Sequence, residues 1–228
     1  MTTSGTPGRS QTCPYIFMEN QYKIFLMGPQ GSGKGTQAEL LSQKLGIPAF
    51  AMGQLLRDEI AAGSDIGMEA DAIMKAGNLV SDEMAAEVLK KRLSQPDTER
   101  GYILDGYPRN AEQAKAFNFD KPTDVVVIDV PDEESLNRLG GRLTCKVCGK
   151  VYSESDGFEE GDACSCGGEL YRRDDDTPEA IAKRLEIYHR DTKPIIDQYQ
   201  QQGVVKHVRG IGSVEEVHDR ILETLGME

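Results

Sequence analysis

The stretch GPQGSGKGT, residues 28–36, constrains the fold of this chain more than any other part of the sequence. It follows the short apolar run YKIFLMG, residues 22–28, which is typical of a buried parallel strand, and a helical pattern runs from Gly33 to Leu45. Between a strand and a helix, closely spaced glycines let successive backbone N–H groups point into one concavity, where phosphate binds at the positive end of the helix. The stretch therefore predicts an α/β fold with a phosphate-binding loop, in which Lys34 neutralises the β and γ phosphates of a nucleoside triphosphate.

The loop differs from the general phosphate-loop pattern at one position. The general pattern has serine or threonine directly after the lysine, whereas here Gly35 intervenes and the hydroxyl belongs to Thr36. In this respect GKGT resembles the loop of the nucleoside monophosphate kinases more than that of switch GTPases or motor ATPases. A kinase also has to hold a phosphoryl acceptor in line with the nucleoside triphosphate.

Four further apolar runs are as short as the first and predict the other strands of a sheet. They lie at residues 47–50, 102–105, 124–130 and 203–208. Amphipathic helical stretches separate them, and this alternation is typical of a parallel sheet with right-handed crossovers. Helix starts are marked by Ser81, by Thr177 with Pro178, and by Ser213 with Glu216. We therefore expect a five-stranded parallel sheet flanked by helices.

Residues 141–175 interrupt this alternation with a segment rich in glycine, cysteine, aspartate and serine, which predicts a surface insertion. The segment contains four of the five cysteines, arranged as a C-x2-C pair and a C-x-C pair: Cys145, Cys148, Cys164 and Cys166. In a reducing compartment, clustered cysteines act as metal ligands or catalytic thiols more often than as disulfides. The second pair is one residue tighter than in a usual zinc ribbon. The spacing therefore leaves a metal site, a redox site or no site open, with Asp162 as a substitute ligand.

The charge of the chain excludes some classes of partner. A net charge of −12 argues against broad binding of nucleic acid or anionic membranes, because such binding requires a positive surface. No apolar run approaches the roughly 20 residues of a membrane-spanning helix, and the first residues lack the apolar region of a secretory signal. We therefore expect a cytoplasmic protein. Residues 1–20 predict a flexible tail, in which Cys13 is an unpaired thiol.

Cationic side chains recur around a possible site of phosphoryl transfer. LDGYPRN, residues 104–110, places Asp105 at the carboxyl end of a predicted strand, where ligands of α/β sheets bind, with Arg109 close by. Further arginines follow, namely Arg57, Arg138, Arg142, Arg172 and Arg184. Taken alone, each of these arginines is expected to have a solvated guanidinium at the protein surface.

The order and spacing of these motifs resemble those of the adenylate kinase family, in its long form with a zinc-type lid. The similarity runs from about Lys23 to the C-terminus and rests on GPQGSGKGT, GQLLRDEI, AGNLVSDE, DGYPRNAEQA, LNRLGGRLTC, the four cysteines and LYRRDDDTPEAIAKRLEIY. It implies a monomer that uses Mg2+ to transfer a phosphoryl group reversibly from ATP to AMP, giving two ADP. It also implies a P-loop core at residues 21–50, 81–140 and 176–228, a helical NMP-binding insertion at 51–80 and a zinc-ribbon-like lid at 141–175.

The resemblance also implies site residues, by their place in these motifs. The implied ATP contacts are Gly31, Ser32, Gly33, Lys34, Gly35, Thr36, Arg138, Arg142, Val151, Tyr152 and Gly212. The implied AMP contacts are Met52, Arg57, Asn78, Leu79, Val80, Gly106, Tyr107, Pro108, Arg109, Gln113, Arg172 and Arg184. The implied catalytic residues are Lys34, Asp105 on the magnesium shell, Arg109, Arg142, Arg172 and Arg184. Asp174 and Asp175 are expected to tie the lid arginines into the closed state, Gly140 and Gly141 to be hinges, and the four cysteines to bind a structural Zn2+.

One departure from the family bears on the acceptor. Where the family commonly has Thr-Gly-Asp, this chain has Met52-Gly53-Gln54, and a thioether cannot replace a hydrogen bond from a threonine hydroxyl to a nucleotide base. AMP remains the expected acceptor, because backbone groups near Val80 and the Gln113 amide can suffice, with UMP or CMP as the alternative. Two other classes are disfavoured. The acidic residues of the insertion oppose a zinc-ribbon, nucleic-acid-binding ATPase switch, and the turn-like setting of the cysteines opposes a redox sensor.

Overall fold

The five predicted strands form a single parallel sheet. The computed structural model describes residues 22–117 and 120–227, so the predicted tail and Cys13 lie outside the described residues. The strands are β1 (Tyr22–Met27), β2 (Ala49–Ala51), β3 (Gly101–Asp105), β4 (Asp124–Asp129) and β8 (Val205–Arg209). Their spatial order is β2-β3-β1-β4-β8, and every neighbouring pair is parallel, which confirms the predicted sheet.

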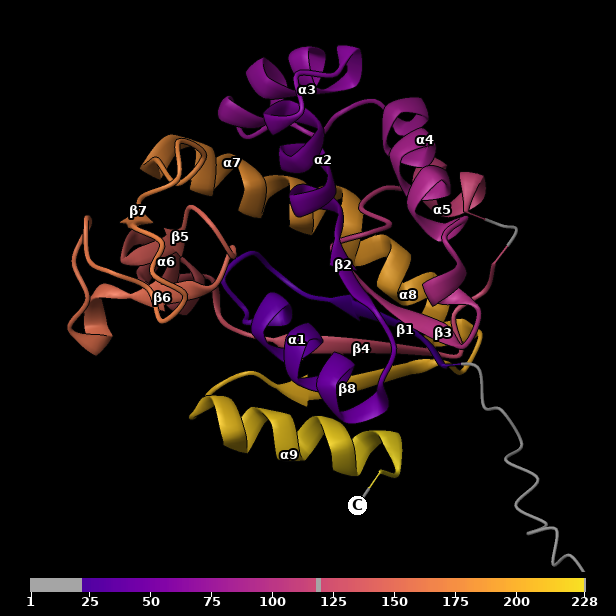
Figure 1. The fold of residues 1–228 in the computed structure, drawn as a ribbon. Coiled ribbons are helices and arrows are strands. Elements are labelled where there is room, and N and C mark those ends of the chain that lie inside the picture. The colour runs from indigo at the N-terminus through magenta and orange to yellow at the C-terminus, as the bar shows by residue number, and fades with distance from the viewer. Residues whose placement is uncertain (1–21, 118–119, 228) are drawn as a thin grey trace, which may run out of the picture.

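The two faces of this sheet have separate hydrophobic cores, because side chains alternate along each strand. On one face Ile24 and Leu26 pack in a cluster with α1 (Lys34–Leu45) and α9 (Val214–Leu225). On the other face Phe25 and Met27 pack in a cluster with α4 (Asp82–Leu93) and α8 (Lys193–Gln201). In the view of Figure 1, α9 lies below the sheet and α4 above it. Helices therefore cover both faces, as the continuous apolar strands predict.

The predicted helix starts are confirmed by their capping hydrogen bonds. The Ser81 hydroxyl accepts from the backbone N–H of Met84 at 3.2 Å at the start of α4. The Thr177 hydroxyl accepts from the N–H of Ala180 at 3.2 Å at the start of α7 (Pro178–Ile187). Ser213 and Glu216 form a reciprocal capping box at the start of α9. Each cap satisfies N–H groups that have no partner within the helix.

Two segments project from this core. Residues 52–75 form α2 (Met52–Ala61) and α3 (Asp65–Lys75), which lie at the top of Figure 1. After α6 (Asp132–Gly140), the chain forms a second, antiparallel sheet of β5 (Arg142–Cys145), β6 (Val151–Ser153) and β7 (Leu170–Tyr171), on the left of Figure 1. Its apolar core is small, with Leu143 and Leu170 fully buried. So few buried apolar side chains give this sheet little stability of its own.

The remaining elements are short or connect these parts. They are α5 (Ala111–Ala116), 3-10 turns at Pro96–Thr98 and Glu154–Asp156, and a π-helical turn at Tyr188–Thr192 that joins α7 to α8. None of the helices within the described ranges is both long and apolar enough to cross a membrane.

Candidate active site and metal centre

The phosphate-binding loop lies where β1 ends and α1 begins. Gly31 and Gly33 have φ angles of 80° and 91°, which favour glycine, and Gly33 caps α1 without any side-chain hydrogen bond. The first backbone N–H groups of α1 therefore have no side-chain cap and can receive an anion. The Lys34 ammonium lies against this loop and donates to the carbonyl oxygens of Gly28 at 2.9 Å and Pro29 at 2.7 Å.

Asp105 faces the start of α1 from the carboxyl end of β3. Its Oδ2 lies 3.6 Å from the position that a Cβ on Gly35 would take, so the carboxylate lies beside the first turn of α1. Burial lowers the pKa of Lys34 to about 8, and Asp105 opposes this shift. Burial also raises the pKa of Asp105, against the opposing effects of Lys34 and Arg109. The two groups are therefore buried together in a region of surplus positive charge.

Three arginines and two aspartates form a buried cluster beside the loop, here called the arginine–aspartate cluster: Arg142, Arg173, Asp175, Asp176 and Arg184. Arg142 donates from Nε to Asp176 Oδ2 at 2.7 Å. Arg173 donates from Nε to Asp175 Oδ1 at 2.8 Å. Arg184 donates from Nη1 to Asp175 Oδ2 at 3.0 Å and to Asp176 Oδ1 at 3.3 Å. The aspartates thus join an arginine of β5 to an arginine of α7.

The pKa shifts in this cluster show which charges act on one another. Burial opposes ionisation of Asp175, but Arg173 and then Arg184 outweigh it and lower the pKa of Asp175 to about 2. Burial, together with Arg142, lowers the pKa of Arg184 to about 10, against the opposing effect of Asp175. With Lys34, Arg57 and Arg109 nearby, the site holds more cations than carboxylates, which suits it to phosphate groups.

Two of the predicted lid residues lie elsewhere. Arg172 was expected at the AMP and at the transferred phosphoryl group, but its guanidinium donates to the Gly140 carbonyl oxygen and to the Glu154 carboxylate, and its side chain is 37% exposed. Asp174 was expected to tie lid arginines together, but its carboxylate is 74% exposed and lies 3.7 Å from Lys75 Nζ. Both placements are therefore corrected.

Arg173 and Asp176 lie in the arginine–aspartate cluster instead, and neither was predicted from the sequence. The sequence Arg172-Arg173-Asp174-Asp175-Asp176 repeats each residue type, so residue type alone cannot identify the inward-facing members. Strand β7 ends at Tyr171 and helix α7 starts at Pro178, so neither strand nor helix periodicity extends through these five residues. One usable signal was that Asp176 directly precedes the Thr177 cap, which holds it beside the first turn of α7.

The predicted acceptor side includes two further cations. Arg109 donates from Nε to the Gly106 carbonyl oxygen at 2.7 Å, and its backbone N–H donates to Gln113 Oε1 at 2.8 Å. None of the described residues accepts a hydrogen bond from the Nε2 group of the buried Gln113 amide, so its two hydrogens can be donated to a ligand. Arg57, on α2, has its pKa lowered to about 10 by burial and then by Arg173.

Met52 packs within the hydrophobic core and is 4% exposed. A packing role for Met52 is compatible with recognition of adenine by backbone groups near Val80 and by the Gln113 amide.

The structure also describes three of the other predicted nucleotide contacts. Arg138 donates from Nη2 to the Gly210 carbonyl oxygen at 3.1 Å and pairs with Glu134 at 2.7 Å. Val151 is 47% exposed on β6. Gly212, with φ 124°, lies just before the capping box of α9.

Two hollows adjoin the predicted site, and they differ in chemistry. A small cavity of about 40 Å³ is lined by residues of the phosphate loop and of the 106–109 segment, including Gln30, Lys34 and Arg109. A larger, open groove of about 630 Å³ is lined by residues 78–83, Asn110 and Arg190 among others. Of the predicted AMP contacts, the groove includes only Asn78, Leu79 and Val80, and it includes no residue of the arginine–aspartate cluster. The smaller cavity is therefore the one at the reacting groups.

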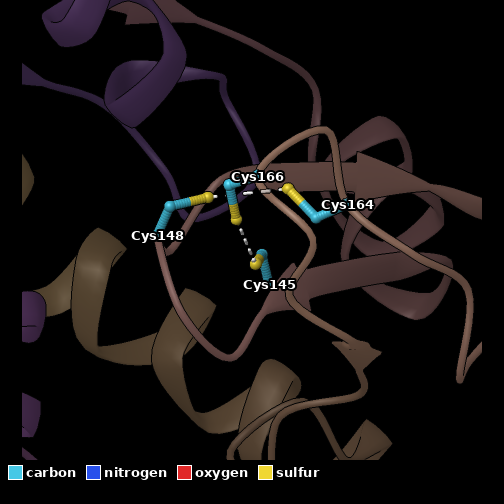
Figure 2. Close-up of side chains that lie close together, drawn as sticks. All are labelled: Cys145, Cys148, Cys164 and Cys166. Carbon is cyan, nitrogen blue, oxygen red and sulfur yellow. Dashed lines mark hydrogen bonds between the residues drawn. The ribbon is translucent and has the colours of Figure 1, made fainter.

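The four clustered cysteines converge on one point of the antiparallel sheet. Figure 2 shows the sulfur atoms of Cys145 and Cys148, from the end of β5 and the turn after it, facing those of Cys164 and Cys166, from the turn before β7. The sulfurs of Cys145 and Cys166 are 3.5 Å apart, and those of Cys148 and Cys164 are 3.6 Å apart. All four lie within 4.8 Å of one another.

This geometry fits a tetrahedral metal ion. Four sulfurs at a Zn–S distance of about 2.3 Å would be about 3.8 Å apart. The tight Cys164-x-Cys166 spacing therefore does not prevent all four thiols from meeting, and Asp162 is not needed as a substitute: its carboxylate accepts from the N–H of Glu159 at 2.8 Å.

Comparisons with known proteins agree with this site. Residues 26–204 match the model of a protein family described as adenylate kinase. A curated protein named adenylate kinase from Thermodesulfovibrio yellowstonii is 44% identical over 211 residues, which are 89% of this chain and 98% of that protein. One from Methanothrix thermoacetophila is 43% identical over 210 residues, 89% of this chain and 97% of that protein. One from Streptomyces coelicolor is 42% identical over 214 residues, 89% of this chain and 98% of that protein.

Proposed function

This chain belongs to the adenylate kinase family, and on that basis we propose that it transfers a phosphoryl group reversibly from MgATP to AMP, giving two ADP. The observation that carries the proposal is the convergence of the phosphate loop, Asp105 and the arginine–aspartate cluster at the carboxyl end of the parallel sheet. Ligands of open α/β sheets bind at that edge.

On the donor side, the uncapped start of α1 and Lys34 receive the phosphates of ATP. Residues 31–36 and Arg138 and Arg142 surround the triphosphate, with Val151, Tyr152 and Gly212 toward the adenine. Asp105 and the Thr36 hydroxyl are oxygen donors of the type that magnesium prefers, and they suit the metal shell of MgATP.

On the acceptor side, Arg57 and Arg109 meet the phosphate of AMP. The free Nε2 hydrogens of Gln113 donate to a ring nitrogen of the base, and backbone groups of residues 78–80 complete its recognition. Gly106, Tyr107 and Pro108 line the adjoining wall. Met52 contributes packing only, which supports AMP over UMP or CMP.

The chemistry requires no covalent intermediate. The transferred phosphoryl group carries charge on its equatorial oxygens, and positioned cations stabilise that charge. Arg142, Arg173 and Arg184 supply the cations, with Asp175 and Asp176 holding the guanidinium groups in place. Arg173 has the role first expected of Arg172.

Each of the three expected parts of the chain has its own role in this reaction. Residues 21–50, 81–140 and 176–228 form the core, residues 51–80 bind the acceptor, and residues 141–175 are the lid. The lid has to exclude water, because ATP next to water would be hydrolysed. The bond from Arg142 on β5 to the buried Asp176 supports this division, since it joins the root of the lid to the core.

We also propose that the four cysteines bind a structural Zn2+. A small sheet with few buried apolar residues gains stability from a metal ion, and four thiolates leave no open position for catalysis. Elemental analysis of protein purified without added zinc should find close to one zinc per chain. Metal-free protein with an intact lid would contradict this proposal.

We also propose that the protein is a cytoplasmic monomer that binds neither nucleic acid nor membranes. The net charge of −12 supports the absence of phosphate-backbone and anionic-membrane partners. Light scattering of the purified protein, with and without ATP and AMP, should report a single chain in each case.

The acceptor is tested by measuring ADP formation from ATP, magnesium and one of AMP, UMP, CMP or GMP. AMP should give the highest turnover, and ATP alone should give almost none. Activity on another monophosphate without activity on AMP would overturn the proposal that AMP is the acceptor. ADP formation that does not depend on any monophosphate would indicate an ATPase switch instead.

A further inference from the structure

Gln54, which is exposed on the surface of α2, contacts the acceptor-side arginine Arg57 on the same helix. Arg57 donates to Gln54 Oε1 from Nε at 3.2 Å and from Nη2 at 3.0 Å. Gln54 in turn donates from Nε2 to Asp58 Oδ1 at 2.8 Å. The three side chains thus form a chain of hydrogen bonds along one turn of the helix.

The chemistry of this chain of bonds fixes the orientation of the amide. A guanidinium has only donors and an ionised carboxylate has only acceptors, so Gln54 has to turn its oxygen to Arg57 and its nitrogen to Asp58. A Cβ on Gly53 would lie 3.4 Å from Arg57 Nη1, so the guanidinium lies beside the first turn of α2. Among the described residues, Gln54 is the only one that hydrogen bonds to the Arg57 side chain.

The lid turn that follows Cys148 lies close to this contact. A Cβ on Gly149, next to Cys148, would lie 3.8 Å from Gln54 Oε1. The two N–H groups that Arg57 gives to Gln54 leave the other guanidinium hydrogens available to an anion. The orientation of these remaining donors therefore depends on Gln54.

We propose that Gln54 is a positioning residue for the acceptor nucleotide, which holds the Arg57 guanidinium in the orientation that meets the phosphate of AMP. The inference rests on the proposed function, in which Arg57 binds that phosphate. It assigns a role in the acceptor site to a residue at which this chain departs from the common Thr-Gly-Asp pattern.

Steady-state kinetics of Gln54→Ala test the proposal, with AMP and ATP varied separately. A side chain that only positions a binding group contributes about one charge-assisted hydrogen bond, so KM for AMP should rise about tenfold. KM for ATP and the melting temperature should stay close to those of the wild type. Gln202→Ala is the matched control, because Gln202 is exposed and its amide donates only to the Gln198 carbonyl oxygen at 3.4 Å.

A rescue experiment separates positioning from a general structural effect. The double variant Gln54→Glu/Asp58→Asn retains an oxygen acceptor for Arg57 and a donor–acceptor contact between positions 54 and 58. It should restore KM for AMP to within about threefold of the wild type.

Three outcomes would overturn the inference: an unchanged KM for AMP in Gln54→Ala, an equal rise in KM for ATP, or no rescue by the double variant. Failure of the wild-type protein to use AMP at all would instead overturn the proposed function.

Discussion

Two adjacent arginines at the root of the lid have opposite surroundings. Arg173 lies in the arginine–aspartate cluster and pairs with Asp175, whereas Arg172 is partly exposed and pairs with Glu154. We expect Arg173→Lys to lower kcat by about a hundredfold, since a lysine cannot form the two-point contact with the carboxylate and a displaced transition-state cation costs about that much. Arg172→Lys should lower kcat less than about threefold. Equal losses in the two variants would contradict the assignment of Arg173.

Tyr152, which is proposed to lie toward the adenine, also contacts the cysteine cluster. Its hydroxyl lies 3.2 Å from Cys164 Sγ and accepts from the N–H of Ser165 at 3.4 Å, so it faces the cysteines. A donor to a metal-bound thiolate supports the ligand from outside the coordination sphere, and losing it typically weakens metal binding about tenfold or more. Tyr152→Phe should therefore bind zinc at least about tenfold more weakly in competition with a chromophoric chelator. Tyr171→Phe, on β7, is the matched control, and the same affinity in both variants would exclude this role.

At the scale of elements, the lid sheet depends on close approach of a backbone turn to the cysteines. A Cβ on Gly168 would lie 2.6 Å from Cys145 Sγ and 2.8 Å from Val147 Cγ2. Gly168→Ala should therefore displace Cys145, lower the melting temperature and reduce bound zinc, with a loss of stability of about 1–3 kcal/mol typical of overpacking. Gly140→Ala is the control, because a Cβ there would meet no atom within 4 Å. Full zinc occupancy in Gly168→Ala would show that the turn can move without loss of the site.

The helix starts differ in whether a side chain caps them. Helices α4, α7 and α9 begin with a serine or threonine side-chain cap, whereas α1 begins at Gly33 without one. A side-chain oxygen at the start of α1 would compete with phosphate for the same N–H groups. Side chains therefore cap α4, α7 and α9, whereas the N–H groups at the start of α1 stay available to an anion.

At the scale of the whole molecule, many charges act on Lys34. Burial lowers its pKa to about 8, and Arg109, Arg184 and Arg142 also lower it. In the free protein, the ammonium that binds ATP phosphate is therefore lost above pH 8. We expect kcat/KM for ATP at saturating AMP to fall up to about tenfold per pH unit above 8, since this parameter reports the enzyme form to which ATP has not yet bound. A profile for ATP that stays flat to pH 9.5 would contradict the role of Lys34, and the profile for AMP at saturating ATP is the control.

The parts of this molecule that depend on neighbouring residues could be predicted from the sequence. The five apolar runs became the five strands, and the predicted caps at Ser81, Thr177 and Ser213 are present. The phosphate loop also lies between its predicted strand and helix. The reason is physical: strand alternation, helix capping and the glycine-rich turn are set within a few residues of the chain.

Contacts between distant segments were decided only by the tertiary structure. Arg173 and Asp176 face inward because β5 and α7 place Arg142 and Arg184 beside them, and no local periodicity distinguishes them from Arg172 and Asp174. The four sulfurs meet although one cysteine pair has an unusual spacing, since the sheet of β5, β6 and β7 brings the two turns together. The sequence alone determined the fold and the family of the phosphate loop. Which of several equivalent charges reach the phosphates depends on packing, because a side chain's direction in an irregular segment is set by what surrounds it.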